Sequence, residues 1–374
     1  MDESLIYPLP ARAWLDVSVR HLRHNAREIS RASGAALIPM VKANAYGVGV
    51  RGVVAALEPL DPRAFGVATV AECEELRALG VTRDVIVFSP ILREEFRRAA
   101  AARVIPTFGD EHAIAAWSAT GLPYHLAIDT GMNRAGVSWR DVDSVRDAVL
   151  EWPPAGVVTH LHSAELEDGS AELQATRFAD ALSKLKLEGV GGDRLLLHLS
   201  NSAGAALGIV VSQPAGRAAV RPGIFLYGAG PELGLAMQPV VELRARVVEL
   251  RWIEPGDSVS YDATYVATRR ERIATVAAGY ADGYPRSCSN RAWGSLNGTR
   301  VSQRGFVTMD LTMFDCTDVE CEVGDVVTLI GAGVAGGPTV NELADVAGMS
   351  PYELLAGLGA RLERRFIEGG EHEA

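Results

Sequence analysis

The sequence predicts an α/β protein: a (β/α)8 TIM-type barrel followed by a mostly antiparallel β domain. From about residue 13 to residue 228, short apolar runs alternate with amphipathic helical segments, which is the pattern of parallel βα units. Some eight or nine such units in roughly 220 residues fit a barrel better than an open doubly wound sheet, which usually has about six strands. After about residue 236 the pattern changes to short alternating strands separated by Gly, Asp and Pro. We therefore expect a barrel domain over residues 11–236 and a β domain over residues 237–374 that also includes residues 1–10.

The expected barrel strands are runs of β-branched and aliphatic residues bounded by turn residues. In chain order they cover residues 13–19, 35–43, 64–69, 84–90, 104–110, 124–130, 156–163, 194–200 and 219–228. Helices are expected between them, for example over residues 21–33 and 70–80. In a barrel, functional side chains gather at the C-terminal ends of the strands. Polar residues of this sequence fall there, namely Lys42, Asp129, His160, His198 and Arg221.

The β domain is expected to consist of short strands joined by tight turns. The candidate segments cover residues 240–253, 256–267, 272–284, 299–310 and 325–331, and a helix is expected over residues 339–350. Tyrosines on such strands usually serve cross-strand packing, so nothing local marks Tyr261 or Tyr265 as a base.

Composition excludes several classes of protein. The chain has 374 residues, 48% of them hydrophobic and 22% charged, which is ordinary for a globular protein. A net charge of -11 argues against nucleic acid as a partner. Cys73, Cys288, Cys316 and Cys321 have neither zinc-site spacing nor the density of a disulfide scaffold. We find no signal peptide and no run of about 20 apolar residues, so no membrane is expected and the predicted location is the cytoplasm.

A lysine closes the apolar run in "VKANAYGVGV" (41–50) and allows two interpretations. Lys42 could be a surface residue at the end of a strand, as most lysines are exposed. Alternatively, Lys42 could be an amine held in an enclosed pocket with a lowered pKa, ready to form a Schiff base with a carbonyl group.

The other polar motifs are also ambiguous when each is taken alone. Arg221 could donate to a heteroaromatic nitrogen without giving up its proton, or could form a surface pair. Asn201 and Ser202 could begin a phosphate site or simply cap a helix. Arg134 could clamp a carboxylate from a loop that Gly131 turns. The pair in "THLHS" lacks further ligands at a recognisable spacing, so no metal site is expected.

Together, and in this order, nine segments resemble alanine racemase, a pyridoxal 5'-phosphate (PLP) enzyme with a barrel and a β domain. They are "VKANAYG", "DTGMNRAG", "THLHSAE", "HLSNSAG", "RPGIFLYG", "VSYDATY", "AGYADGYPR", "MD" (309–310) and "PYE" (351–353). They lie between residues 41 and 353, which is nearly the whole chain.

The resemblance implies a role for each matching residue. Lys42 would hold the cofactor and Arg221 would face its pyridine nitrogen, oriented by His198. His160 would lie beside the ring. Arg134 would bind the substrate carboxylate, and the partner subunit of a homodimer would supply Tyr261 and Met309. The remaining residues implied to bind the cofactor, mostly at its phosphate, are Tyr46, Asn201, Ser202, Gly223, Ile224 and Tyr352.

Racemisation then needs one acid/base group on each face of the substrate Cα. The resemblance assigns the D side to Lys42 and the L side to Tyr261, whose ordinary pKa values both lie near 10 and must be lowered for use at neutral pH. The product D-alanine is expected to supply peptidoglycan.

Three positions depart from the usual family pattern. Val48 replaces a histidine, Ala127 replaces a lysine that is often carbamylated, and Phe306 stands where an arginine often guards the entrance. The altered entrance keeps open a racemase of broader or serine-preferring specificity. A non-catalytic PLP homeostasis protein is a further alternative, although such proteins lack a domain carrying "VSYD".

Overall fold

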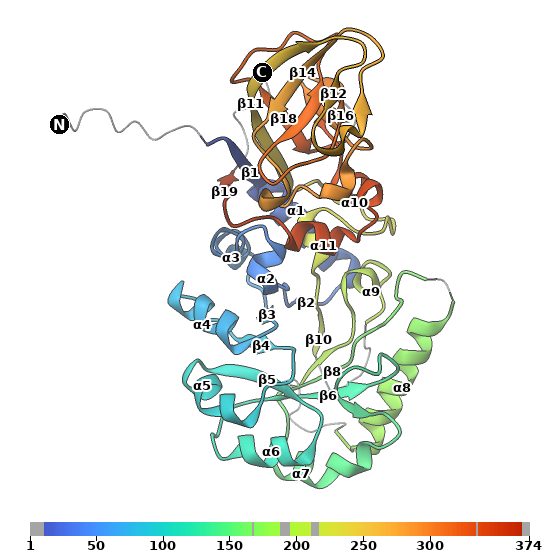
Figure 1. Ribbon diagram of the computed structural model, residues 1–374. Helices are drawn as coiled ribbons and strands as arrows, with labels where there is room; N and C mark the ends of the chain where they lie inside the picture. The colour runs from blue at the N-terminus through green and yellow to red at the C-terminus, as the bar shows by residue number, and fades with distance from the viewer. Residues whose placement is uncertain (1–10, 167, 188–194, 211–216, 334–335, 369–374) are drawn as a thin grey trace, which may run out of the picture. The chain divides into compact units, whose positions relative to one another are not determined.

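The computed structural model describes residues 11–166, 168–187, 195–210, 217–333 and 336–368 (Figure 1). The chain forms two compact units. The barrel unit contains Leu22–Leu226 and Pro231–Gln238, and the β unit contains Met1–His21, Tyr227–Gly230 and Pro239–Ala374. The expected assignment of residues 1–10 to the β domain lies outside the described residues.

A ring of parallel strands forms the barrel unit. Its strands run in the order β2, β10, β9, β8, β6, β5, β4, β3, and a parallel bridge between Met40 and Gly66 joins the two ends. The short β7 pairs only with β6. This arrangement confirms the predicted (β/α)8 barrel. The bounds are β2 (Ala36–Leu37), β3 (Phe65–Val67), β4 (Val85–Val87), β5 (Val104–Phe108), β6 (His125–Asp129), β7 (Val137–Ser138), β8 (Gly156–Val158), β9 (Leu196–His198) and β10 (Arg217–Val220).

Helices alternate with these strands, and some of them begin at conventional capping residues. Thr69 and Glu72 form a capping box at α4, and Asp110 caps α6 through the N–H of Ala113 at 2.8 Å. The helices are α1 (Val19–Ser33), α2 (Lys42–Tyr46), α3 (Val50–Leu57), α4 (Val70–Ala78), α5 (Phe96–Ala101), α6 (Glu111–Ser118), α7 (Arg146–Glu151), α8 (Ser170–Lys184) and α9 (Ser202–Ala206).

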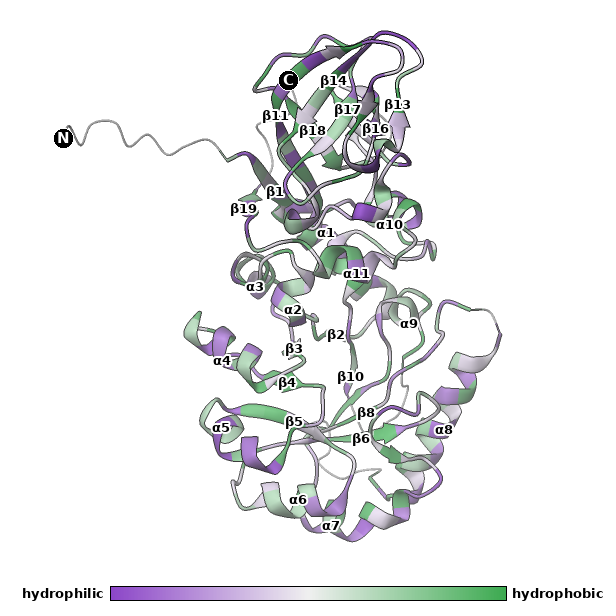
Figure 2. Ribbon diagram, viewed as in Figure 1, coloured by the Kyte–Doolittle hydropathy of each residue, from purple (hydrophilic) through white to green (hydrophobic). Residues whose placement is uncertain are grey.

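Part of the barrel interior is an apolar cluster. A buried cluster takes one residue from each of six strands or their ends: Ile38, Ala64, Ile86, Ile105, Leu196 and Ala219. Figure 2 shows the same contrast, because the strands are hydrophobic while the helices carry hydrophilic stretches. Burial on both faces explains why these strands read as continuous apolar runs in the sequence.

One expected barrel strand belongs to the β unit. The run over residues 13–19 forms β1 (Ala13–Ser18), which pairs antiparallel with β11 and parallel with β19. The expected start of the barrel at residue 11 was therefore wrong. An apolar strand of this composition can join either the barrel sheet or the sheet of the β unit. Its own sequence does not determine which strand it pairs with.

The β unit is a mostly antiparallel sheet. Its strand order is β14, β17, β16, β15, β18, β11, β1, β19, and β11 also pairs with β14. The bounds are β11 (Val241–Ile253), β12 (Ser258–Val259), β13 (Tyr265–Val266), β14 (Glu271–Val276), β15 (Trp293–Leu296), β16 (Thr299–Arg304), β17 (Thr312–Asp315), β18 (Val326–Ile330) and β19 (Glu363–Ile367). Two helices lie between β18 and β19 in the chain, α10 (Val340–Ala347) and α11 (Pro351–Ala356). Among the described helices of both units, none has the length and apolarity needed to cross a membrane.

Candidate functional site

Lys42 begins a left-handed turn instead of ending a strand as expected. The four residues after it, Ala43 to Tyr46, have φ between 52° and 56°. Each non-glycine residue in this conformation costs roughly 1–2 kcal/mol, so the turn persists only where surrounding contacts determine it. The sequence "ANAY" gives little sign of this conformation, since only asparagine tolerates it well.

Two side chains hold the turn, one from outside it and one from within it. The Glu72 carboxylate accepts the N–H of Ala43 through Oε1 at 2.7 Å, and its Oε2 accepts the N–H of Ala68 at 2.7 Å. Asn44 Oδ1 accepts the N–H of Val50 at 2.8 Å, which ties the turn to α3. Glu72 therefore joins the Lys42 turn to the corner between β3 and α4.

The surroundings of Lys42 favour its neutral amine. Burial lowers the pKa of Lys42 below its ordinary value, and the positive charges of Arg134 and Arg221 lower it further. The Glu72 carboxylate opposes this shift. A neutral lysine amine is both a nucleophile towards a carbonyl group and a base, as the enclosed-pocket interpretation requires.

Arg221 is the centre of a buried polar cluster. Its side chain is 4% exposed, and the Nη1 group donates to the carbonyl of His198 at 2.5 Å and to His198 Nδ1 at 3.1 Å. The Nη2 group donates to the carbonyls of Thr159 and Leu199 at 2.7 and 3.0 Å and to His160 Nδ1 at 3.2 Å. Among the described residues, no group accepts from its Nε–H, which leaves that donor for a ligand.

The two histidines around Arg221 are neutral. Burial, followed by the charges of Arg221, Arg134 and Lys42, lowers the pKa of His160 to about 3. Burial also holds the pKa of His198 well below its ordinary value. The Nδ1 atoms of both rings are thus free to accept from Arg221.

A small cradle forms where β10 ends. Ser202 is buried, and its hydroxyl accepts the N–H of Gly223 at 2.9 Å. A Cβ atom on Gly223 would lie 2.3 Å from the hydroxyl oxygen of Tyr46, so a larger residue would require the tyrosine to move. Asn201 caps α9 through the N–H of Gly204 at 3.0 Å, the structural role that its sequence context allowed. Ile224 comes directly after Gly223 and begins the short helix η6 (Ile224–Tyr227).

Arg134 is exposed and lies in a loop shaped by Asp129. The Asp129 Oδ1 atom accepts the N–H groups of Gly131 at 2.8 Å and of Asn133 at 3.1 Å. Arg134 is close enough for its charge to affect the pKa of both Lys42 and His160. It therefore lies near the other charged residues of the barrel site.

The other predicted residues belong to the β unit and are exposed. The exposed fractions are 70% for Tyr261, 53% for Met309 and 47% for Tyr352. Phe306 carries the guanidinium of Arg286 over its ring at 4.3 Å, so a positive charge stands beside the position where the sequence lacks an arginine.

Sequence reasoning missed two residues of the barrel site. Glu72 could have been suspected from the Thr-x-x-Glu capping spacing, although nothing in it shows the bond to Ala43. His125 is 2% exposed and its Nδ1 lies 2.8 Å from His198 Nε2, which no local motif indicates. Within the described ranges, no three His, Cys, Asp or Glu side chains are grouped as a metal site would need.

Comparison with known proteins identifies the family. The alanine racemase N-terminal domain matches residues 17–231, and the alanine racemase C-terminal domain matches residues 240–366. An alanine racemase from Geobacter sp. (strain M21) is 36% identical, with 95% of this chain and 98% of that protein covered. One from Aquifex pyrophilus is 32% identical, with 96% and 99% covered.

Solved structures agree with this comparison. The alanine racemase from Bacillus anthracis with bound L-Ala-P has a TM-score of 0.86 and 30% identity, with 98% of this chain and 97% of that chain covered. The alanine racemase from Bartonella henselae with covalently bound pyridoxal phosphate has a TM-score of 0.84 and 27% identity, with 96% and 100% covered. This chain belongs to the alanine racemase family.

Proposed function

We propose that this chain is a PLP-dependent alanine racemase that reversibly interconverts L-alanine and D-alanine. The single observation that carries the proposal is that Lys42, whose pKa is lowered, lies close enough to the buried Arg221 for the arginine's charge to act on its amine. The family match over both domains supports the same activity. It also argues against a PLP homeostasis protein, because the second domain is present over residues 240–366.

The barrel residues fit PLP. Lys42 would hold the cofactor covalently through its amine. The Gly223 backbone, the Ser202 hydroxyl and the close approach of Tyr46 form a cradle suited to the phosphate, together with Ile224, Asn201 and Tyr352. When bound, the cofactor supplies an electron sink that makes the substrate Cα proton removable.

Arg221 would control how strongly the bound cofactor withdraws electrons. Its Nη groups already donate to protein acceptors, so its Nε–H is the donor suited to the pyridine nitrogen. An arginine donates a hydrogen bond without releasing its proton. The pyridine nitrogen would then stay unprotonated, which limits electron withdrawal and disfavours side reactions. His198 and His160 would orient the guanidinium through their Nδ1 atoms.

Two residues would move the proton. Lys42 would remove or return it on the D side and Tyr261 on the L side, since inversion needs a group on each face. Arg134 would bind the substrate carboxylate, and Met309 would line the substrate site. Because Ala127 stands where the carbamylated lysine would be, the Asp129 loop would have to position Arg134.

We further propose a homodimer in which each β unit supplies Tyr261 and Met309 to the partner's barrel. Most soluble homo-oligomers are closed two-fold dimers, and the exposure of both side chains suits such an exchange. The enzyme would act in the cytoplasm, where its four buried thiols stay reduced, and its D-alanine would enter peptidoglycan.

Incubation with L-alanine in deuterated water tests the proposed reaction. The expected result is deuterium at Cα together with D-alanine, both dependent on added PLP. Parallel reactions with L-serine, L-lysine and L-arginine measure the substrate range. Faster turnover of one of these than of alanine would reject alanine as the preferred substrate, and no exchange with any of them would reject the racemase.

A further inference from the structure

A chain of buried polar side chains extends from Arg221 away from the cofactor site, across the barrel interior. His198 ends β9 and contacts Arg221, and its other ring nitrogen faces His125 at the start of β6. The exposed fractions of His198 and His125 are 0% and 2%. Their ring centroids lie 4.9 Å apart, so the two imidazoles are in direct contact.

Donor and acceptor rules assign the imidazole protons of His198 and His125. Arginine can only donate, so His198 Nδ1 must accept from Arg221 and its proton must lie on Nε2. The His198 Nε2–H then donates to His125 Nδ1 at 2.8 Å. His125 must therefore carry its own proton on Nε2. The opposite tautomer of His198 would place two donors against each other at Arg221.

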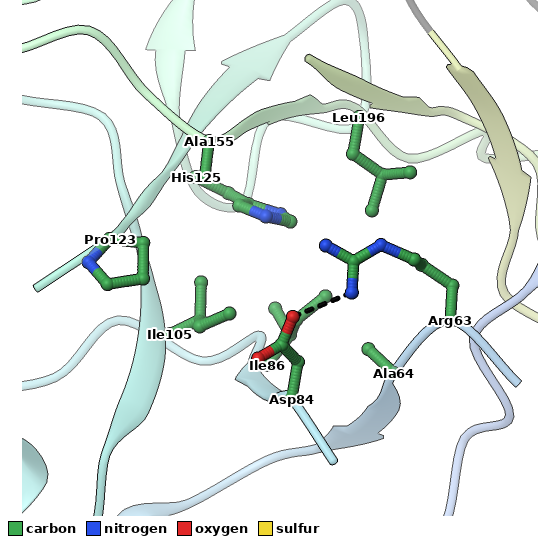
Figure 3. A pocket seen from close by; sticks show the side chains of 9 residues that line it. All are labelled: Arg63, Ala64, Asp84, Ile86, Ile105, Pro123, His125, Ala155 and Leu196. Carbon is green, nitrogen blue, oxygen red and sulfur yellow. Dashed lines mark hydrogen bonds and ion pairs between the residues drawn. The ribbon is translucent and has the colours of Figure 1, made fainter. Parts of the chain in front are cut away.

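A second cation, Arg63, lies beside His125 at the end of this series of side chains. Arg63 and His125 both point into a cavity of about 150 Å³, where Arg63 Nη1 pairs with Asp84 Oδ2 at 2.6 Å (Figure 3). The cavity is large enough to hold water, which can accept the Nε2–H of His125. Burial, and then the charges of Arg63 and Arg221, lower the pKa of His125 to about 3. Both imidazoles thus stay neutral between two guanidinium groups.

We propose that His125 is a positioning residue for the racemase reaction, because it fixes the tautomer of His198 and thereby the orientation of Arg221 beneath the cofactor. The role of Arg221 towards the cofactor rests on the proposed function. The tautomer of His198 does not, since it follows from the protein's own hydrogen bonds. A buried N–H that loses its acceptor is costly, so the effect of removing His125 should reach Arg221.

Three variants separate this role from simple packing. His125→Leu removes the acceptor. His125→Asn places an amide oxygen close to the position of Nδ1 and should keep the acceptor. Thr107→Val is the matched control, because Thr107 is buried, is the β5 register partner of His125 and bonds only the carbonyl of Val87 at 3.1 Å.

The test combines nuclear magnetic resonance of 15N-histidine-labelled holoenzyme with PLP titration of the cofactor-free protein. In the wild-type protein we expect His198 protonated at Nε2 alone. In His125→Leu we expect an altered His198 pattern and about a ten-fold weaker PLP affinity, the cost of one buried hydrogen bond. His125→Asn should restore both readouts, and Thr107→Val should change neither.

A wild-type His198 protonated at Nδ1 would overturn the proposal, and this result does not depend on any variant folding. The same holds if His125→Leu matches Thr107→Val in both readouts. If the expected resonance pattern appears in a protein without racemase activity, the proposed function fails while the tautomer assignment stands.

Discussion

Lys42 and Tyr261 both stand at left-handed turns built from residues other than glycine, but the two turns differ in what surrounds them. After Lys42, four consecutive residues have φ between 52° and 56°. Around Tyr261, the φ values are 67° for Ser260, 59° for Asp262 and 46° for Ala263. Such strain is maintained by surrounding contacts and is concentrated at functional sites.

The turn in the barrel unit is enclosed, while the turn in the β unit is open. Glu72 and Asn44 hold the Lys42 turn, and Arg134 and Arg221 act on the pKa of its amine. The Tyr261 turn is held mainly at its base, where the Ser260 hydroxyl donates to the carbonyl of Phe306 at 2.8 Å. Tyr261 itself is 70% exposed. The barrel unit thus sets the chemistry of its lysine by itself, whereas Tyr261 needs surroundings from elsewhere.

The largest effect is expected at the enclosed turn. Lys42→Ala should abolish racemisation and the absorbance of the covalently held cofactor, because no other amine lies in that cluster. Absorbance spectra and D-alanine formation measure the two losses. The chain's other lysines, Lys184 and Lys186, provide the control, and their alanine variants should match the wild type. A Lys42→Ala protein that still racemises alanine would contradict the assignment of Lys42 as the essential amine.

At the open turn, we expect a smaller and one-sided effect. Tyr261→Phe should slow proton removal from L-alanine by roughly 10²–10⁴-fold, the usual contribution of an acid/base group, while PLP binding survives. Deuterium exchange from L-alanine and from D-alanine, measured separately, shows the asymmetry. Tyr265→Phe is the control, since that hydroxyl donates to Glu271 at 2.7 Å and serves the fold. Equal slowing of both enantiomers would contradict the assignment of one residue per face.

Two Thr-x-x-Glu capping boxes among the described helices provide a matched pair for the anchor of the Lys42 turn. Thr69 and Glu72 cap α4, and Thr339 and Glu342 cap α10 with the same bonds. Alanine at either glutamate should cost about 1 kcal/mol of stability. Only Glu72→Ala should also reduce kcat, by about ten-fold, because it alone frees the N–H of Ala43.

A pH–rate profile gives a second readout of the Glu72 variant. The Glu72 carboxylate raises the pKa of Lys42, so its removal should move the limb that reports Lys42 to lower pH. Identical behaviour of Glu72→Ala and Glu342→Ala in kcat and in pH profile would show that the turn is held without Glu72.

The last prediction concerns acid stability and not catalysis. His125 and His198 are buried and neutral, and their folded pKa values lie below the unfolded value of about 6.5. The unfolded barrel unit therefore binds more protons, so the stability contributed by these histidines is full above that pH and is lost as the pH falls below it. The described part of the β unit has only the half-buried His21.

Acid should therefore open the barrel unit at a higher pH than the β unit. Hydrogen exchange, followed by mass spectrometry of peptides from each unit and corrected for the intrinsic rate, measures both transitions. Coincident transitions, or an earlier one in the β unit, would contradict this difference between the units.

Much of the fold follows from local patterns, because buried parallel strands require apolar runs and turns require Gly, Asp and Pro. The misplaced β1 shows the limit: its sequence predicts a strand, but pairing is decided by distant segments. The expected strand over residues 219–228 also ends early, at Val220, and η6 follows. The Pro222–Gly223 pair before η6 marks this break.

The candidate site was partly predictable for a related reason. Lys42, Arg221 and His198 could be proposed because they follow strands whose C-terminal ends meet in a barrel. Glu72 and His125 could not, since their importance lies in single hydrogen bonds to residues distant in the sequence, Ala43 and His198. The left-handed turn after Lys42 is imposed by such contacts as well.

Mixing the Lys42→Ala and Tyr261→Phe variants tests most directly whether the two turns complete one site across a dimer. Each hybrid dimer would hold one site with both native residues, so random exchange of subunits in an equal mixture should recover about a quarter of the wild-type rate. Native mass spectrometry of differently labelled subunits confirms the exchange. Activity near that level is the predicted result, and demonstrated exchange without activity would contradict the shared site.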